Sequence, residues 1–310
     1  MSKGLTVSII FNAQSLNYGE GTGNVSELKK LSRDNGLVYS YASRQAIRYD
    51  IVRIGMQHFN WPTLGEELES VGDGNKKTIQ FAKNASISIS PEIDFFGYMK
   101  TEKGRGALNR AAVVRLSSAV ALEPYLNDIE FLSNKGLADR MALVKKEDIH
   151  PNIAQLEQHM SFYTYTVTVD LDRVGIDEDI KLDNMERAKR VKELLEILKV
   201  LNREIKGRVE NLNPLFVIGG IYDIKNPFFM GRLKLEWKSV TPSIALNPIK
   251  ETLSVTFKGQ VTGSNTYVGL VSGIWGNEDE LKQLPVKRVA DIETVFSELA
   301  GEVKAFYESA

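Results

Sequence analysis

The chain has 310 residues, of which 43% are hydrophobic and 25% charged, an ordinary globular composition that excludes a disordered or fibrous protein. It contains no cysteine, which excludes disulfides, thiolate nucleophiles and thiolate metal sites. The net charge of −1 argues against a uniformly basic nucleic-acid binder. Because the N-terminal apolar run is too short and too polar for a signal peptide or a membrane span, we expect a cytoplasmic protein without membrane contact.

Positive charge nevertheless gathers in two stretches. Residues 24–53 carry six basic and three acidic side chains, a local charge of +3, and residues 100–115 carry five basic and one acidic, a local charge of +4. The rest of the chain, at −1 − 7, carries −8. A basic surface on an otherwise acidic protein favours an anionic ligand, and solvated runs of charge are the alternative.

The N-terminal half alternates strand and helix patterns. Residues 4–13, "GLTVSIIFNA", are β-branched and apolar and predict a buried strand. The segment 39–57 predicts a helix that begins near Ser43. The alternation of 85–99 predicts a second strand, whose length Pro91 limits. Four residues give the helix an apolar face: Ala46, Ile47, Ile51 and Ile54.

The second half repeats the pattern. "FYTYTVTVDLD" (162–172) predicts a strand, and 182–207 a long helix with Asp183 as N-cap and Gly207 at its end. Residues 214–223 predict a buried strand. The tail adds three strand candidates, 231–240, 251–259 and 266–275, and a final helix over about 290–307.

The order β-α-β, interruption, β-α-β predicts an α+β fold of the ferredoxin-like type, the split βαβ that RNA-recognition-motif domains also use. The long, partly basic stretch 97–161 separates the two halves and predicts an insertion. We expect one elaborated domain rather than two.

The loop "SLNYGEGTGNVSELKK" (15–30) follows the first strand and carries Gly19, Gly21 and Gly23. A dinucleotide loop needs G-x-G-x-x-G and a Walker loop ends in Gly-Lys-Ser/Thr, and this loop has neither. Three interpretations remain open. The glycines serve a wide turn, let a polynucleotide backbone approach the main chain, or form a divergent nucleotide site.

"SRQAIR" (43–48) begins the first predicted helix. Ser43 and Gln45 are uncharged donors at a helix N-terminus, where free amides favour anions. Arg44 and Arg48 lie one turn apart on one face, so both can reach the same run of phosphates. An ordinary helix start is the alternative.

Catalytic patterns are scarce. His58, His150 and His159 have no metal-ligand spacing, no G-x-S-x-G is present, and the acidic stretch 170–183 lacks the EF-hand register. We expect no metal and no cofactor. The sheet aromatics Phe162, Tyr163 and Tyr165 lie outside any RNA-recognition-motif consensus, and we expect them to pack rather than to stack bases.

Five segments in order give the chain a family resemblance: "SLNYGEGTGN", "YSYASRQAIRYD", "DFFGYM", "VVRLSSAVALEP" and "FYTYTVTVDLDRVG". Together, over residues 5–223, they resemble the CRISPR Cascade backbone subunit, and within that family the DevR-type branch associated with type I-B systems. The loop with N-Y-G-E-G and the S-R-Q-A-x-R helix start are the most specific parts.

The resemblance implies a modified RNA-recognition-motif palm with inserted finger and thumb elements. The palm corresponds to residues 4–96 and 162–223, a finger or web to 97–119, the thumb to 120–161, and a C-terminal extension to 224–310. Copies of such a subunit line up along a CRISPR RNA in a helical filament, beside other Cascade subunits, and the guide then pairs with a target DNA strand.

The residues implied to bind RNA lie in the glycine loop, the first helix, the "DFFGYM" segment and the finger: Asn17, Tyr18, Gly19, Gly21, Ser43, Arg44, Gln45, Arg48, Met99, Lys103 and Arg105. Phe131 or Leu132 is the implied apolar wedge of the thumb. Some type III relatives cut RNA with an aspartate after the first strand. Residues 12–24 contain Glu20 but no aspartate, so the resemblance implies binding without catalysis.

Two other functions remain. A transcriptional autoregulator that binds duplex DNA is a role ascribed to some DevR-type proteins, although no helix-turn-helix is visible in the sequence. The other is a nucleotide-dependent enzyme that uses the Gly19–Gly23 loop.

Overall fold

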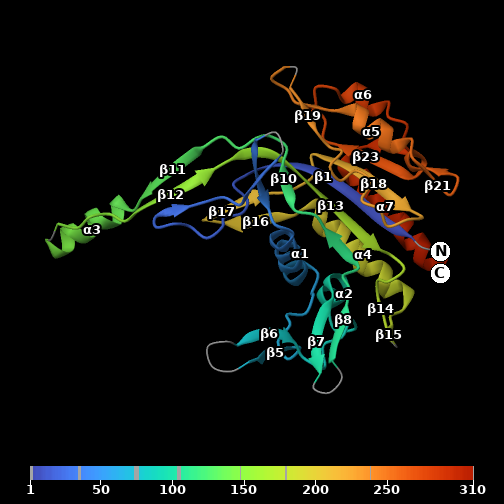
Figure 1. Ribbon diagram of the computed structural model, residues 1–310, viewed down its shortest axis with the longest axis horizontal. Helices are drawn as coiled ribbons and strands as arrows, with labels where there is room; N and C mark the ends of the chain where they lie inside the picture. The colour runs from blue at the N-terminus through green and yellow to red at the C-terminus, as the bar shows by residue number, and fades with distance from the viewer. Residues whose placement is uncertain are drawn as a thin grey trace.

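One mixed sheet carries helices on one face and a C-terminal layer on the other (Figure 1). The computed structural model describes residues 3–33, 36–72, 77–102, 106–146, 148–178, 180–237 and 239–309. Within these residues the sheet has the order β24-β23-β18-β1-β13-β10-β4-β3, and β9 also pairs with β13. Its strands are β1 (Gly4–Gln14), β3 (Lys30–Ser32), β4 (Val38–Ala42), β9 (Val114–Leu116), β10 (Ala119–Ala121), β13 (Met160–Asp170), β18 (Phe216–Tyr222), β23 (Thr266–Leu270) and β24 (Arg288–Ala290).

The three strands predicted at 4–13, 162–172 and 214–223 are confirmed as β1, β13 and β18, side by side at the centre of the sheet. β1 pairs antiparallel with β13 over its whole length, from Gly4 opposite Asp170 to Gln14 opposite Met160. On its other side β1 pairs antiparallel with β18. Since all three strands are apolar and central, they are buried on both faces.

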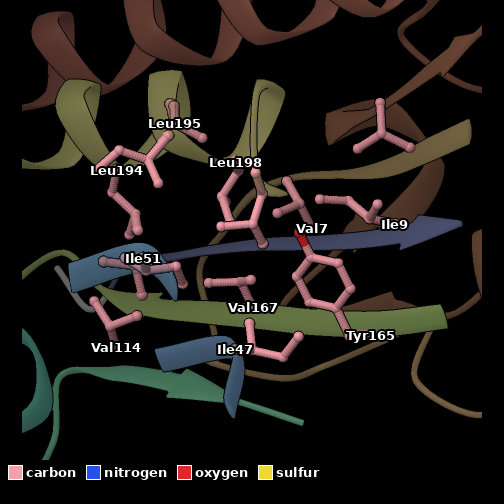
Figure 2. Packing of buried hydrophobic residues seen from close by; sticks show 14 of the residues in the cluster. Val7, Ile9, Ile47, Ile51, Val114, Tyr165, Val167, Leu194, Leu195 and Leu198 are labelled. Carbon is pink, nitrogen blue, oxygen red and sulfur yellow. The ribbon is translucent and has the colours of Figure 1, made fainter. Parts of the chain in front are cut away.

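The main core lies between one face of the sheet and three helices, α1 (Arg44–His58), α4 (Asn184–Lys199) and α7 (Ile292–Glu308). Figure 2 shows Val7 and Val167 of the strands between Ile51 of α1 and the leucines of α4. The predicted apolar face of α1 is confirmed, because all four of its residues are buried. Ser43 caps the helix and its Oγ accepts a bond from Ala46 N at 3.3 Å.

The predicted strand at 85–99 is wrong. Residues 85–90 form turns, Ser90 caps the short helix α2 (Pro91–Phe96), and a strand begins only at Tyr98. Ile87 and Ile93 are buried in a small cluster of their own, which produced the apolar pattern without an extended chain. The strand expected after α1 in the chain is supplied by β9 and β10 instead, and both pair with β13 in the sheet.

The predicted helix at 182–207 ends early. Asp183 caps α4 as predicted, but the helix ends at Lys199, with Val200 as its C-cap. Residues beyond it form a hairpin of β16 (Asn202–Ile205) and β17 (Arg208–Asn211), and Gly207 lies in its turn at φ 79°. Met185, in the first turn of α4, is 81% exposed and lies outside the buried face of that helix.

The tail before α7 covers the second face of the sheet, whereas α7 itself packs on the first. Ile10, Phe216 and Ile218 point into a core closed by tail residues such as Phe229 and Trp275. Two of the three predicted tail strands are much shorter than predicted, and only β19 (Leu235–Glu236) and β21 (Thr256–Phe257) form within them. The third, β23, and the final helix are confirmed. The other tail elements are β20 (Ser243–Ile244), α5 (Leu246–Leu253), β22 (Gln260–Val261), a 3-10 turn (Thr262–Asn265) and α6 (Glu278–Lys282).

The stretch 97–161 departs from the sheet and returns to it. Its first part is a hairpin of β7 (Tyr98–Glu102) and β8 (Gly106–Arg110). Its second part, which we call the arm, comprises β11 (Asp128–Ser133), α3 (Lys135–Lys145) and β12 (Ile153–Gln158), and projects far from the sheet in Figure 1. Three small paired elements complete the described chain: β2 (Val25–Ser26) on β12, β5 (Leu68–Val71) with β6 (Thr78–Phe81), and β14 (Ile176–Asp177) with β15 (Ile180–Lys181).

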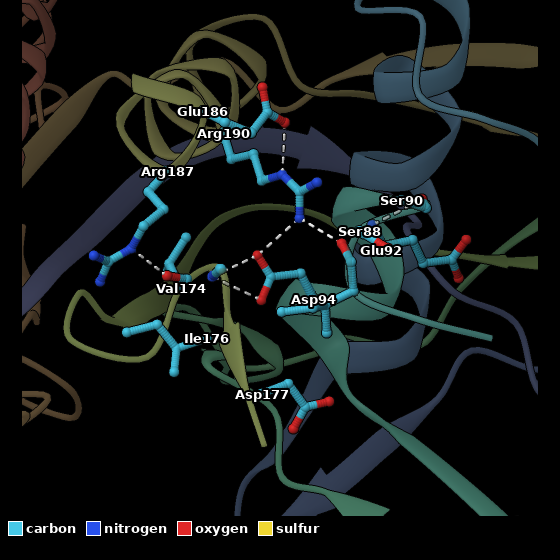
Figure 3. Close-up of polar contacts among 12 residues, drawn as sticks. Ser88, Ser90, Glu92, Asp94, Val174, Ile176, Asp177, Glu186, Arg187 and Arg190 are labelled. Carbon is cyan, nitrogen blue, oxygen red and sulfur yellow. Dashed lines mark hydrogen bonds and ion pairs between the residues drawn. The ribbon is translucent and has the colours of Figure 1, made fainter. Parts of the chain in front are cut away.

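A buried carboxylate, Asp94 of α2, joins the β7–β8 hairpin to α4. It accepts bonds from Arg110 Nη2 at 2.6 Å, from Arg190 Nη1 at 3.0 Å and from the amide of Gly175 at 2.9 Å. Figure 3 shows Arg190 reaching it from α4, where Glu186 holds the same guanidinium at 2.8 Å. The side chains of both arginines are almost fully buried, and Asp94 is the buried carboxylate that they share. Arg190 has Glu186 as a second partner and Arg110 has Asp177, at 3.2 Å.

Replacing Asp94 tests whether its carboxylate holds the β7–β8 hairpin to α4. Asp94→Ala leaves two guanidiniums in the interior without their shared partner, and we expect the free energy of unfolding to fall by about 3–5 kcal/mol. Urea denaturation followed by circular dichroism measures it. Glu308→Ala, which breaks the exposed i,i+4 pair with Lys304, is the control and should leave the midpoint almost unchanged. Equal midpoints for the two variants would contradict this role of Asp94.

Candidate nucleic-acid interface

The N-terminus of α1 opens onto a basic cleft. Arg44 and Gln45 are exposed in its first turn, which contains no acidic residue. The cleft has a volume of about 380 Å³ and is lined by Arg44, Gln45, Arg48, Phe96, Ala111, Ala112, Val114, Arg115 and Leu116. Three guanidiniums therefore meet the positive end of a helix dipole, an arrangement suited to phosphate.

Arg48 is held in place inside this cleft. Its Nη2 lies 3.1 Å from Oε1 of Glu92, and its guanidinium lies over the ring of Phe96, 4.8 Å from the centroid. α2 thus fixes the direction of Arg48. Arg44, by contrast, is exposed and forms no ion pair within the described ranges, so its charge faces solvent.

Arg115 is the residue that sequence reasoning did not assign to the site. It lies in β9, at the edge of the basic stretch 100–115, and its side chain is exposed on the cleft wall opposite α1. The local charge of +4 was the available signal. Its proximity to α1 depends on the pairing of β9 with β13, which the wrong strand at 85–99 concealed.

The glycine loop folds as a small hairpin. Gly19 N donates to Glu27 O at 2.8 Å, and Thr22 and Val25 exchange backbone bonds. A Cβ on Gly21 would lie 2.3 Å from Val25 O, so only glycine fits there, and Gly23 takes φ 59°. These contacts favour the turn interpretation for the glycines, and the amide of Gly19 is already bonded within the loop.

Asn17 ties this loop to the cleft. Its Oδ1 accepts a bond from the amide of Ser43 at 3.1 Å, directly before α1, and its backbone oxygen accepts from Lys29 N at 2.8 Å. On the same side Arg203 of β16 donates to Leu16 O at 2.6 Å and pairs with Asp50 of α1 at 2.8 Å. The loop and the helix start are therefore bonded into one unit.

The loop is bonded to the root of the arm as well. Glu157 of β12 is buried and accepts from Leu28 N at 2.7 Å and from Lys30 Nζ at 2.6 Å. Tyr18 donates its hydroxyl to Glu157 O at 3.0 Å, and burial raises the pKa of that phenol. β2 extends the contact as a strand parallel to β12.

His159, between β12 and β13, packs in the same region. Its Nδ1 lies 2.7 Å from Ser40 Oγ, and its ring contacts Tyr125 and Tyr163 edge-on. Burial lowers the pKa of this imidazole below its usual value, so the ring is neutral near pH 7. The geometry therefore indicates a packing role for this histidine.

Comparison with known proteins decides the family. A family model described as "CRISPR-associated negative auto-regulator DevR/Csa2" matches residues 5–233. The chain belongs to the DevR/Csa2 family. A search of curated proteins gives no match.

Two solved structures resemble the fold of this DevR/Csa2 chain. One is a chain of a "CRISPR RNA-guided surveillance complex, pre-nicking", with 12% identity, a TM-score of 0.56, and coverage of 96% of this chain and 100% of that one. The other belongs to a "CRISPR RNA-guided surveillance complex", with 11% identity, a TM-score of 0.51, and coverage of 95% and 99%. At these identities the similarity concerns the fold.

The remaining predicted residues of the DevR/Csa2 chain lie apart from the cleft lining. Met99 is 63% exposed in β7, and Phe131 and Leu132 are exposed in β11 of the arm. Lys103 and Arg105 lie outside the described residues. The sheet aromatics pack as expected: Tyr163 and Tyr165 are buried around Phe11, with ring centroids 5.8 Å from it.

Two features are absent from the described ranges. No group of three or more His, Asp or Glu side chains lies close enough there to hold a metal ion. No helix in that part of the chain is both long and apolar enough to cross a membrane.

The bonds of Glu157 predict that the loop depends on the arm root. Glu157→Gln removes the charge that holds Lys30 and weakens the bond to Leu28, at a cost of about 1.5–3 kcal/mol for the hydrogen bonds to a charged group. We expect faster amide hydrogen exchange over residues 22–28 and unchanged exchange in α4. Asp148→Asn, an exposed acidic residue of the arm, is the matched control. Protection that stays equal in both variants would disprove the coupling.

Proposed function

We propose that this protein is a non-catalytic CRISPR-RNA-binding subunit. It multimerises along the guide as the helical backbone of a type I interference complex and leaves the guide free to pair with target DNA. The observation that carries the proposal is the cleft at the start of α1, where Arg44, Arg48 and Arg115 converge in a chain of the DevR/Csa2 family. The likeness in fold to chains of two RNA-guided surveillance complexes supports it.

The cleft favours recognition of a backbone rather than of bases. Guanidiniums and helix-terminal amides bind phosphates of any sequence, so they position a strand without reading it. Reading is then left to base pairing between guide and target, as in other guide-dependent effectors. Such a subunit needs no cofactor, and its partners are the guide RNA, the target strand, copies of itself and other complex subunits.

A modified RNA-recognition-motif palm is supported by the strand order. β18-β1-β13-β9/β10 corresponds to the order 4-1-3-2 of a split βαβ fold, and α1 and α4 cover the same face. The opposite face, on which ordinary RNA-recognition motifs stack bases, is closed. Thr6 bonds there to Thr168 at 3.3 Å and to Asn226 O of the tail at 3.1 Å. The RNA path in this proposal therefore runs past α1 rather than over the sheet.

Binding without cleavage is supported by the loop after β1. Its one carboxylate within residues 12–24 is Glu20, which is exposed. A loop of this composition lacks the aspartate that RNA-cutting relatives place there.

Multimerisation is supported by the arm. Leu137, Met141 and Val144 follow one another at helical spacing on α3 and are 59%, 45% and 83% exposed. They border a hollow of about 620 Å³, and Ile129 and Phe131 of β11 are exposed as well. We propose this arm as the thumb over 120–161, the β7–β8 hairpin as part of a finger over 97–119, residues 4–96 and 162–223 as the palm, and 224–310 as its extension. Exposed apolar side chains gathered on one projecting element favour coverage by a neighbouring copy.

The cleft arginines are tested through salt dependence. Arg44→Ala with Arg115→Ala removes two phosphate contacts, and we expect weaker binding to single-stranded RNA of any sequence. The plot of log K against log[salt] should become shallower by about 1.4, since each contact on a single strand contributes about 0.7. Fluorescence anisotropy of a labelled RNA over a range of salt concentrations measures both.

Lys192→Ala with Lys304→Ala is the control, because it makes the same charge change at the α4–α7 groove. Arg48 is examined as Arg48→Ala with Glu92→Ala, which removes both partners of the ion pair. A slope unchanged in the arginine variant rejects the cleft as the RNA site. Tighter binding to the duplex upstream of its own gene than to RNA favours the auto-regulator function instead.

The arm is tested through the stepwise addition of copies. Leu137→Ser with Met141→Ser makes the exposed face of α3 polar, and we expect the first gel shift on a long RNA to persist while the ladder of further shifts disappears. Asp139→Ser on the same helix is the control and should keep the ladder. A full ladder from the double variant would show that this face of α3 is not the contact between copies.

A further inference from the structure

Trp237 is the exposed tryptophan of this chain. The protein has three tryptophans, and Trp61 and Trp275 are each 4% exposed whereas Trp237 is 50% exposed. Tryptophan side chains are on average well buried, because they carry the largest apolar surface of any residue. An indole half in water therefore calls for an explanation.

The ring of Trp237 is supported from behind. Its centroid lies 6.5 Å from that of Phe162, at the start of β13, and Phe162 lies 5.6 Å from Trp275. Trp275 is fixed in turn by a bond from its Nε1 to Leu215 O at 3.2 Å. Trp237 is thus the outer member of an aromatic row that is rooted in the core, so little conformational freedom remains to be lost on binding.

Two exposed cations precede this tryptophan by three and five residues in the sequence. Arg232 and Lys234, just before β19, are exposed, and neither pairs with a carboxylate anywhere in the described ranges. Residues 232–237 contain these two basic residues and one acidic residue, Glu236. An exposed indole and exposed cations within one short segment are features of proteins that bind single-stranded nucleic acids, where a base stacks on the ring and phosphates meet the charges.

The location separates this surface from the cleft. Trp237 contacts Phe162 directly after the root of the arm, and it belongs to the C-terminal layer, whereas α1 lies on the other side of the sheet. Figure 1 shows β19 and α1 on opposite sides of the central strands. A strand bound in the cleft by its backbone would therefore have to reach the other face of the sheet to meet Trp237.

We propose that Trp237, Arg232 and Lys234 form a second contact for single-stranded nucleic acid, in which a base stacks on the indole. The inference goes beyond the proposed function, because the cleft holds only backbone and Trp237 adds a base-stacking site that is tolerant of sequence. The ligand is a single strand, either the guide itself or a strand added to it.

The fluorescence of Trp237 reports directly on binding at this site. Oligouridylate or oligothymidylate of about ten nucleotides is titrated into the full chain while tryptophan emission is recorded, with Trp237→Phe as the reference for the two buried tryptophans. We expect quenching and loss of access to acrylamide in the natural protein alone. In an anisotropy assay with the same labelled oligomers, Trp237→Leu should bind roughly ten-fold more weakly, because stacking on one base is lost. Val240→Ser, in the same loop and 95% exposed, should bind normally.

Two additions distinguish the source of the strand. Quenching on the first addition assigns the guide, and quenching only after a complementary strand is added assigns that second strand. Arg44→Ala with Arg115→Ala separates the two proposals, since quenching that persists there leaves the Trp237 site standing whatever becomes of the cleft.

Equal affinity in Trp237→Leu and the natural protein, or emission that stays unchanged at saturation, overturns the inference. Protection of Trp237 that follows protein concentration without nucleic acid, together with a doubling of mass in light scattering, also overturns it. That result would assign the surface to a contact between copies.

Discussion

The antiparallel pairing of β1 with β13 determines where the functional parts of this protein lie. Eleven residues of each strand are paired, so the last residue of β1, Gln14, lies opposite the first of β13, Met160. The glycine loop leaves β1 at this end and the arm enters β13 at the same end. Ser15 and His159 continue the pairing beyond the strands, with Ser15 N bonded to His159 O at 3.0 Å. The glycine loop and the arm are neighbours for this reason, although Ser15 and His159 are 144 residues apart in the sequence.

The sequence predicted the elements whose local pattern and tertiary environment agree. β1, β13 and β18 are apolar and β-branched and lie at the buried centre of the sheet, and α1 has both a serine cap and a continuous apolar face. The 85–99 segment failed because Ile87 is buried in a turn, where alternation carries no information on backbone conformation. α4 was extended too far because Leu201 and Ile205 keep the helical spacing, while the pairing of Arg203 with Asp50 stabilises a hairpin there instead.

The site was predicted in part. "SRQAIR" located one wall of the cleft, since a helix start with arginines one turn apart is a local property of the sequence. Arg115 and the partners of Arg48 depend on contacts between distant segments, such as Glu92 on α2, and no local pattern contains them. Trp237 was equally invisible, because its exposure results from how the tail folds over Phe162.

The exposed arm has a consequence for assembly size. A contact between two different surfaces of identical chains leaves the outer chain with the same unused surface, so each addition prepares the next. In a helical filament the rotation between copies does not close a ring, and the series stays open. In the proposed assembly, protein–protein contacts alone would set no limit on growth. The length of the bound strand then determines how many copies can bind, because each added copy needs a free stretch of backbone for its own arginines. The number of copies in such an assembly is therefore set by the nucleic acid and not by the amino-acid sequence of the subunit.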